Sequence, residues 1–174
     1  MFAWGNPSRG DDAVGPWFAQ RFRHLVNDTF DLVEDFQLQV EHLLDCREGD
    51  LLLFVDASQP ASAAYRFSEV IPSGELGHTS HALSPAELLG QYPRLFASQP
   101  PSAFLLQIPG WRFELGQSMS PATRRSCEMA AELVERLLEK RHLNAWRAAC
   151  GSEDETGFPG LSPRSAAVQP SAGT

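Results

Sequence analysis

Five consecutive apolar residues, from Leu51 to Val55, constrain the fold of this chain more than any other feature. A strand that is apolar throughout must be covered on both faces, as is the central strand of a parallel sheet that carries helices on either side. The run ends at Asp56, so this strand also delivers a carboxylate to its carboxyl end. The pattern predicts an α/β domain with polar residues gathered where its strands end.

The rest of the chain alternates between segments typical of strands and segments typical of helices. Residues 65–71 alternate between apolar and polar side chains, which indicates an edge strand with one exposed face. Ser84-Pro85 and Ser120-Pro121 each place a capping residue before a proline, as at the start of a helix. We therefore predict a three-layer α/β domain with a largely parallel central sheet, helices on both faces and one possible antiparallel edge. The expected strands are residues 2–4, 31–36, 51–55, 65–71 and 104–108, and the expected helices are residues 11–25, 40–44, 84–92 and a long stretch from residue 121.

Chain length and composition favour one domain followed by a tail. The chain has 174 residues, of which 43% are hydrophobic, and this is enough for one sizeable core but short for two. The composition changes near the end of the chain, where glycine, proline and serine dominate. We expect a single domain over residues 1–146 and a disordered tail over residues 147–174.

The charge and the cysteines exclude several classes of function. A formal net charge of −8 and a pI near 5.0 argue against nucleic acid as a partner. No apolar run is long enough to span a membrane, and no basic segment precedes an apolar one at the N-terminus, so we expect a cytoplasmic monomer without membrane contact. Cys46, Cys127 and Cys150 form no Cys-x-x-Cys motif and are odd in number, which favours reduced thiols.

The segment from Gly5 to Gly15 is the first candidate for a functional site. It follows the short apolar segment 2–4, contains a dense cluster of turn residues and leads into a helix whose apolar residues recur every three or four positions. Asp11 and Asp12 therefore fall at a helix N-terminus, where the unpaired N–H groups favour ionised carboxylates. One acid is sufficient for a cap, which leaves the second free for another role.

Three side chains are expected to converge, although their positions are far apart in the sequence. The carboxyl ends of parallel strands lie on the same edge of a sheet, so Asp12 and Asp56 are expected to approach each other there, together with a histidine, His78 or His81. Two carboxylates and an imidazole suit a borderline divalent metal such as nickel or zinc. The alternative is structural: Asp56 could cap the turn that follows it, and either histidine could be a solvated loop residue.

Other catalytic templates fit the sequence less well. The chain has no His-Glu-x-x-His motif and no Gly-x-Ser-x-Gly elbow, and the segment 5–15 contains no lysine of the kind that a phosphate-binding loop needs. None of the three cysteines lies where a nucleophile would be expected. An aspartic dyad of Asp12 and Asp56, with one carboxyl kept protonated by the charge of the other, remains open.

The residues around these candidates resemble a known family, the hydrogenase maturation proteases, which are nickel-dependent endopeptidases that trim the C-terminus of the large subunit of [NiFe]-hydrogenases. The resemblance extends from Phe2 to about Leu138. The opening Gly-Asn-Pro-x-x-x-Asp-Asp-x-x-Gly is specific to that family, and it also looks like the branch that serves soluble, NAD-linked hydrogenases. Three further segments agree in the same order, namely residues 52–57, 80–89 and 115–121.

The resemblance implies a function and a set of site residues. Asp12, Asp56 and His81 occupy the family's three metal-contacting positions, whereas His78 matches none of them. The implied cofactor is nickel supplied by the substrate, with no permanent metal, and the implied partner is the large-subunit precursor. The chain departs from the family at Ala13, where glycine is usual, and at residues 110–112, where Gly-Trp-Arg replaces a hydrophobic-Glu-Pro segment. The first strand is also about three residues short.

Two other functions are compatible with the sequence. The first is an aspartic-type peptidase that does not depend on nickel and uses the dyad described above. The second is a binding module that checks for nickel during hydrogenase maturation but does not catalyse cleavage. The two departures from the family pattern, at Ala13 and at residues 110–112, favour this alternative.

Overall fold

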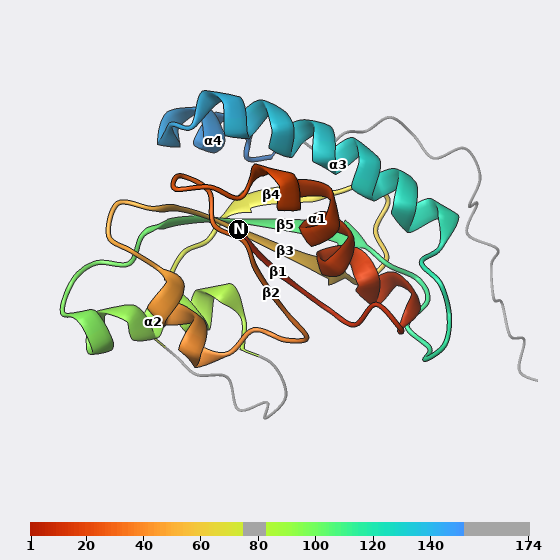
Figure 1. The fold of residues 1–174 in the computed structure, drawn as a ribbon, viewed down its shortest axis with the longest axis horizontal. Helices are drawn as coiled ribbons and strands as arrows, with labels where there is room; N and C mark the ends of the chain where they lie inside the picture. Colours follow the sequence, from red (N-terminus) through yellow and green to blue (C-terminus); the bar gives the residue numbers. More distant parts are fainter. Residues whose placement is uncertain (75–82, 152–174) are drawn as a thin grey trace, which may run out of the picture.

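A five-stranded sheet with helices on both faces organises residues 1–74 and 83–151, which are the residues that the computed structural model describes (Figure 1). The strand order is β2-β1-β3-β5-β4. The first four strands in this order run parallel to one another, and β4 runs antiparallel to β5 at the edge. The predicted fold class is confirmed, including the antiparallel edge. The strands are β1 (Phe2–Trp4), β2 (Val33–Asp35), β3 (Leu51–Ser58), β4 (Arg66–Glu69) and β5 (Ser102–Pro109).

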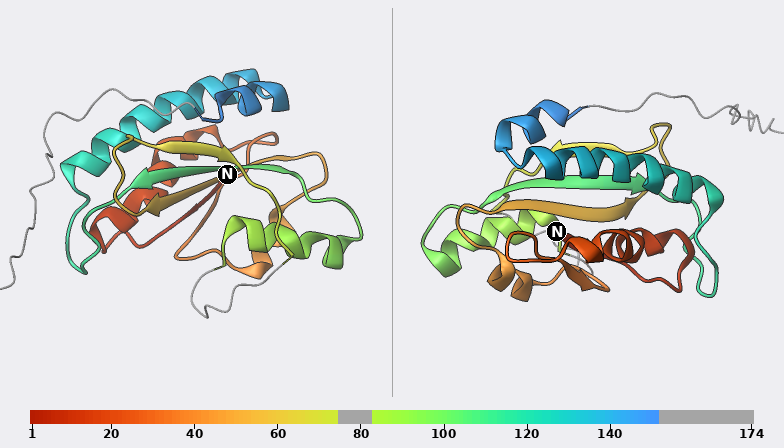
Figure 2. Two further views of the ribbon diagram at one scale, coloured as in Figure 1. Left: turned by 180° about the vertical axis from the view of Figure 1, so that it is seen from behind. Right: turned by 45° about the horizontal axis from the view of Figure 1, so that its top comes forward.

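Two apolar cores, one on each face of the sheet, explain the continuous apolar run in β3. Leu53 and Val55 belong to one core, whereas Leu52 and Phe54 belong to the other. All four of these side chains are buried. The helices α1, α3 and α4 cover the first face of the sheet, and α2 and η3 lie on the second (Figures 1 and 2). The α-helices are α1 (Val14–Phe22), α2 (Pro85–Phe96), α3 (Pro121–Lys140) and α4 (Leu143–Ala149). Three shorter 3-10 helices are η1 (Gly10–Ala13), η2 (Arg23–Leu25) and η3 (Val40–Asp45).

The two predicted helix starts are confirmed, and one predicted end is wrong. Ser84 accepts a hydrogen bond from the backbone N–H of Glu87, and Ser120 accepts one from that of Thr123, so both serines cap their helices. The helix expected over residues 84–92 ends later than predicted, because α2 continues to Phe96. The ring of Tyr92 packs against that of Phe96 with centroids 4.6 Å apart, which stabilises this last turn.

The domain boundary expected at residue 146 falls inside α4. Trp146 is buried, and its indole N–H donates to the carbonyl oxygen of Leu137. Beyond it, Arg147 forms an ion pair with Glu69, and the N–H of Gly151 donates to the carbonyl oxygen of Phe67. Residues 147–151 therefore belong to the domain, whereas residues 152–174 of the expected tail lie outside the described residues. None of the described helices is long and apolar enough to cross a membrane.

Candidate active site

Loops that follow β1, β3 and β5 come together at one edge of the sheet. These strands are parallel, and the right-hand view of Figure 2 shows β3 and β5 pointing the same way, so their carboxyl ends share this edge. The loop after β1 contains Asp12, and Asp56 lies near the end of β3. The expectation that the sheet brings these two carboxylates together is supported by the contact of η1 with β3.

Two glycines let the segment around Asp12 lie directly against the end of β1. A Cβ atom on Gly5 would lie 2.0 Å from the carbonyl oxygen of Asp12, and one on Gly15 would lie 2.1 Å from that of Trp4. Gly5 also has a φ of +142°, a backbone conformation that residues with a side chain rarely adopt. The glycines of the sequence motif are thus required for close backbone approach, and this approach places η1 beside the strand end.

Asp11 is a structural residue rather than a helix cap, which corrects the expectation from the sequence. Its side chain is fully buried, and η1 has no side-chain cap. One carboxylate oxygen accepts hydrogen bonds from the N–H groups of Trp111 and Arg112, at 2.8 and 3.1 Å, and the other accepts one from the N–H of Ser120, at 2.6 Å. Burial alone would raise the pKa of Asp11, but the hydrogen bonds to its charged form hold that pKa below its ordinary value. The carboxylate therefore fastens the loop between β5 and α3 to η1.

Backbone hydrogen bonds strengthen the same junction. The N–H of Asp11 donates to the carbonyl oxygen of Arg112 at 2.7 Å, and that of Gly10 donates to the carbonyl oxygen of Gln117 at 3.0 Å. On the other side, the N–H of Gly110 donates to the carbonyl oxygen of Ser58 at 3.0 Å. The β5–α3 loop is thus tied both to the segment that carries Asp12 and to the end of the strand that carries Asp56.

Asp12 remains available for chemistry. Among the described residues, its carboxylate accepts one hydrogen bond, at 3.1 Å, from the N–H of Asn6, and Asp12 is partly exposed. That single bond orients the carboxylate and leaves acceptor positions free for a substrate, a water molecule or a metal ion. The two adjacent aspartates therefore have different roles: Asp11 is buried in the protein, whereas Asp12 is partly exposed at the edge of the sheet.

Asp56 has a strongly perturbed carboxyl group. Burial, together with the negative charge of nearby Asp12, raises its pKa from 3.8 to about 7, although a hydrogen bond from the N–H of Ala57 opposes the shift. A carboxyl that titrates near neutrality and has a charged partner is typical of functional sites. Such a group can exchange a proton, or can lose it when a cation binds.

The third predicted member of the site, His81, lies outside the described residues, as does His78. Within residues 1–74 and 83–151, no group of three or more histidine, cysteine, aspartate or glutamate side chains could hold a metal ion. His42 has a structural role: its Nδ1 accepts a hydrogen bond from the N–H of Gln39, and its Nε2 lies 3.3 Å from Asp35. The three cysteines are free, with Cys46 and Cys127 buried.

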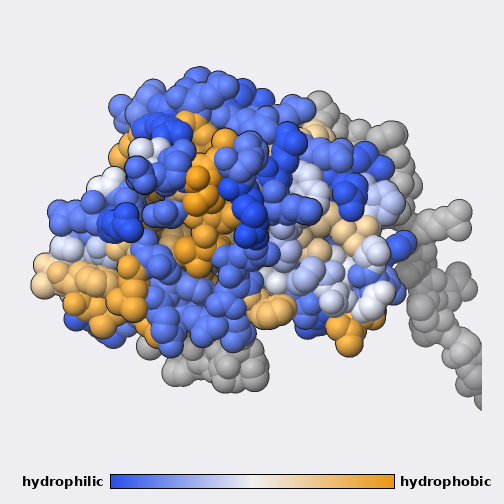
Figure 3. Space-filling view, viewed as in Figure 1, coloured by the Kyte–Doolittle hydropathy of each residue, from blue (hydrophilic) through white to orange (hydrophobic). Residues whose placement is uncertain are grey.

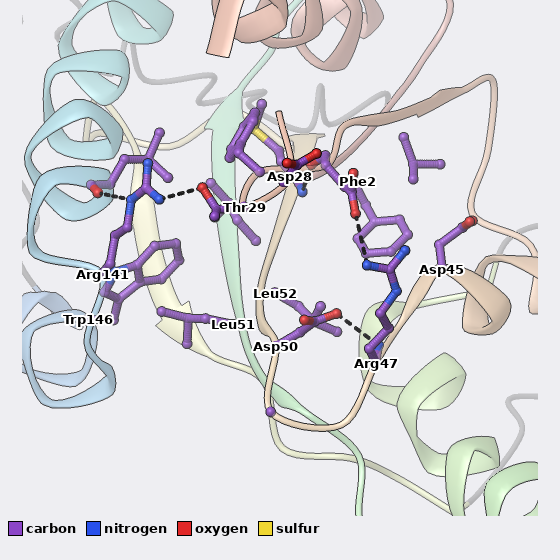
Figure 4. Close-up of a pocket in the computed structure, with 17 residues that line it drawn as sticks. Phe2, Asp28, Thr29, Asp45, Arg47, Asp50, Leu51, Leu52, Arg141 and Trp146 are labelled. Carbon is purple, nitrogen blue, oxygen red and sulfur yellow. Dashed lines mark hydrogen bonds and ion pairs between the residues drawn. The ribbon is translucent and has the colours of Figure 1, made fainter. Parts of the chain in front are cut away.

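A cavity of about 300 Å³ opens at the opposite edge of the sheet (Figure 4). Its lining includes Met1, Leu51 and Trp146, and its rim includes charged residues such as Asp50 and Arg47. Figure 3 shows the corresponding apolar hollow, bordered by hydrophilic residues. The pairing of β1 with β3 begins at Phe2 and Phe54, so the first residues of β3 have no partner in β1. The cavity lies at the N-terminal end of the short strand β1, and its lining includes neither Asp12 nor Asp56.

Comparison with solved structures identifies relatives of this fold. The domain is similar to the hydrogenase maturating endopeptidase HybD from E. coli, with a TM-score of 0.64 and 20% sequence identity over 80% of this chain and 91% of that chain. It is also similar to the [NiFe] hydrogenase maturation protease HycI from Thermococcus kodakarensis, with a TM-score of 0.57 and 22% identity over 79% of this chain and 90% of that chain. A solution structure of the endopeptidase HycI from Escherichia coli gives a TM-score of 0.58 and 18% identity over 79% and 88% of the two chains.

These likenesses establish that the chain has the fold of the hydrogenase maturation proteases, as the resemblance in the sequence implied. A comparison with models of known protein families and one with curated protein sequences found no match.

Proposed function

We propose that this protein is an endopeptidase that removes the C-terminal extension of a [NiFe]-hydrogenase large-subunit precursor after nickel has been inserted. The observation that carries the proposal is the pairing of Asp12 and Asp56 at the carboxyl ends of β1 and β3, with the pKa of Asp56 raised to about 7. The proposal is supported by the motif around these residues and by the fold shared with named maturation proteases.

Nickel enters this reaction with the substrate. The precursor-bound ion would meet Asp12, Asp56 and His81, which form an open set of ligands that leaves coordination positions to the precursor and to water. Binding of a cation near Asp56 would displace the proton that burial favours on this carboxyl. The ion would thereby position the scissile region of the precursor against the carboxylates.

The carboxylates then act on the water and on the peptide. A water molecule held between the ion and one carboxylate would attack the scissile carbonyl carbon, and the carboxylate would accept its proton. The same proton can pass to the leaving amine when the peptide bond breaks. The reaction thus consumes one water molecule and one peptide bond, and it yields a new carboxylate terminus and a new amine terminus.

Alanine replacements of Asp12, Asp56 and His81 test this assignment. Each variant should process nickel-loaded precursor at least about a thousandfold more slowly, because a metal ligand supplies several kcal/mol of stabilisation in the transition state. Intact mass of the precursor against time is the measurement. Asp28→Ala and His24→Ala, which change exposed residues elsewhere, should retain activity. Retained cleavage in all three site variants would refute the proposed site.

An aspartic-type peptidase is a second candidate, because Asp56 shares its environment with the charge of Asp12. Such an enzyme would need one proton on the pair, so its activity would fall as pH rises through about 7. The nickel-dependent enzyme would instead gain activity over this range, because Asp56 must be ionised to bind a cation. The direction of the pH profile therefore separates the two candidates.

A further inference from the structure

The β5–α3 loop, whose backbone is hydrogen-bonded to the segments that carry Asp12 and Asp56, presents exposed apolar and cationic side chains. Trp111 is 37% exposed, and Leu115 is 76% exposed. Arg9 and Arg112 are also exposed, and the Nε of Arg9 donates to the carbonyl oxygen of Phe113 at 3.2 Å. We call these four residues, Arg9, Trp111, Arg112 and Leu115, the Trp111 surface.

The backbone beneath the Trp111 surface is held firmly. The N–H groups of Trp111 and Arg112 both donate to the buried carboxylate of Asp11. A Cβ atom on Gly110 would lie 2.7 Å from the ring of Phe113 and 2.9 Å from Cβ of Asp11, so this part of the loop packs without space to spare. An exposed tryptophan on a rigid backbone loses little conformational entropy when it is covered, which favours its use as an anchor for a partner.

The position of the loop identifies which part of a partner would reach it. Trp111 follows Gly110, whose N–H is bonded to Ser58, two residues beyond Asp56. The backbone N–H of Trp111 also donates a hydrogen bond to the carboxylate of Asp11, the neighbour of Asp12. The backbone of Trp111 thus lies near the residues adjacent to both Asp12 and Asp56, where the segments that flank a scissile bond held by these carboxylates would be found.

The charge of the surface indicates the chemistry of that partner. The Trp111 surface carries two exposed arginines, Arg9 from the loop after β1 and Arg112 from the β5–α3 loop, which also contains Glu114. Neither arginine forms an ion pair with another of the described residues. An exposed guanidinium that has no ion-pair partner among the described residues, next to an exposed indole, favours a bound segment with a carboxylate beside an apolar side chain.

We infer that the Trp111 surface binds the segment of the precursor that flanks the scissile bond, and that it selects a segment with an apolar side chain next to an acidic one. This inference rests on the proposed function. It makes Trp111 and Arg112 determinants of specificity, which act on binding of the substrate rather than on the reaction itself.

Steady-state processing of the nickel-loaded precursor tests the inference. Trp111→Ala is expected to raise KM about tenfold and to change kcat less than about twofold, because truncating an aromatic anchor removes binding shared by the ground state and the transition state. Arg112→Glu should raise KM by a similar factor, and the effect should shrink at high salt. Trp111→Phe should retain most of the affinity. The control is Leu95→Ala in α2, because Leu95 is 59% exposed and α2 ends far from the β5–α3 loop (Figures 1 and 2).

Binding of the precursor to immobilised protein, measured separately, distinguishes this inference from the proposed function. If Trp111→Ala has the same KM and the same affinity for the precursor as the unmodified protein, the inference is overturned. Cleavage by the unmodified protein in the same experiment would still support the proposed function. Binding without cleavage by the unmodified protein, weakened about tenfold in Trp111→Ala, would support the surface and overturn the endopeptidase. Absence of both binding and cleavage would overturn both.

Discussion

Replacing Asp56 by asparagine is expected to make the protein more stable at pH 8, although the same change should remove its activity. Asp56 has a pKa of about 7 in the folded protein against 3.8 as its ordinary value. Folding therefore favours the protonated carboxyl, and ionising it in the folded state costs free energy. Asparagine has the same shape, accepts the hydrogen bond from Ala57 through its amide oxygen and carries no charge.

The size and the pH range of this effect follow from the same values. Below about pH 4 the carboxyl is protonated in both states, and the variant has no advantage. As pH rises from about 4 to about 7, the unfolded chain loses the proton and the folded chain keeps it, so the free energy of unfolding of the unmodified protein declines. Above pH 7 the accumulated cost is about 4 kcal/mol at most, at 1.36 kcal/mol for each pKa unit.

Chemical denaturation at pH 4 and pH 8 measures this difference. The gain in stability of Asp56→Asn should be present at pH 8 and absent at pH 4. Asp28→Asn provides the control, because it removes an exposed carboxylate and should change stability by less than about 0.5 kcal/mol at either pH. Equal or lower stability of Asp56→Asn at pH 8 would show that Asp56 is not held in an environment that disfavours its charge.

Replacing the neighbouring Asp11 by alanine should have the opposite effect on stability, with a loss of about 3–5 kcal/mol at pH 7. The carboxylate is fully buried and accepts N–H groups from Trp111, Arg112 and Ser120. Its removal leaves these donors without their acceptor, and each unsatisfied buried donor costs about 1–3 kcal/mol before the structure relaxes. Such a loss is a large part of the stability of a small domain.

The pH dependence of the Asp11 contribution has the opposite sign to that of Asp56. Its pKa is below the ordinary value, so the stabilisation is fully present above the pKa of the unfolded chain, near 4, and is lost as pH falls through the lower value of the folded state. Denaturation at pH 7 is the measurement, and Asp12→Ala is the matched control, because it removes a partly exposed carboxylate with one backbone donor. A change in Asp11→Ala of less than about 1 kcal/mol would contradict the structural role of this residue.

The adjacent aspartates also show what could be predicted from the sequence and what could not. The apolar run in β3, the helical spacing after Asp12 and the two Ser-Pro helix starts are local patterns, and each was sufficient to predict its element. The roles of Asp11 and Asp12 could not be separated in this way. The partners of Asp11 are backbone N–H groups 100 or more positions away, at Trp111, Arg112 and Ser120, and backbone groups leave no signature in the sequence.

The ends of elements were predicted less well for a related reason. The boundary expected at residue 146 followed the change in composition toward glycine, proline and serine. The contacts that hold α4, from Trp146 to Leu137 and from Arg147 to Glu69, are tertiary and invisible in composition. The convergence of Asp12 and Asp56 could be predicted, because it follows from parallel strands alone. The raised pKa of Asp56 required the burial and the proximity that only the structure gives.

The most direct test of the proposed function compares two forms of one precursor, a C-terminally extended [NiFe]-hydrogenase large subunit with and without its inserted nickel. The purified protein is added to each form, and the intact mass of the precursor is followed with time. The proposal predicts that a C-terminal peptide is lost only from the nickel-loaded form. Equal loss from the nickel-free form would contradict recognition through nickel and favour the aspartic mechanism, and a stable complex with no loss of mass from either form would show a binding module without protease activity.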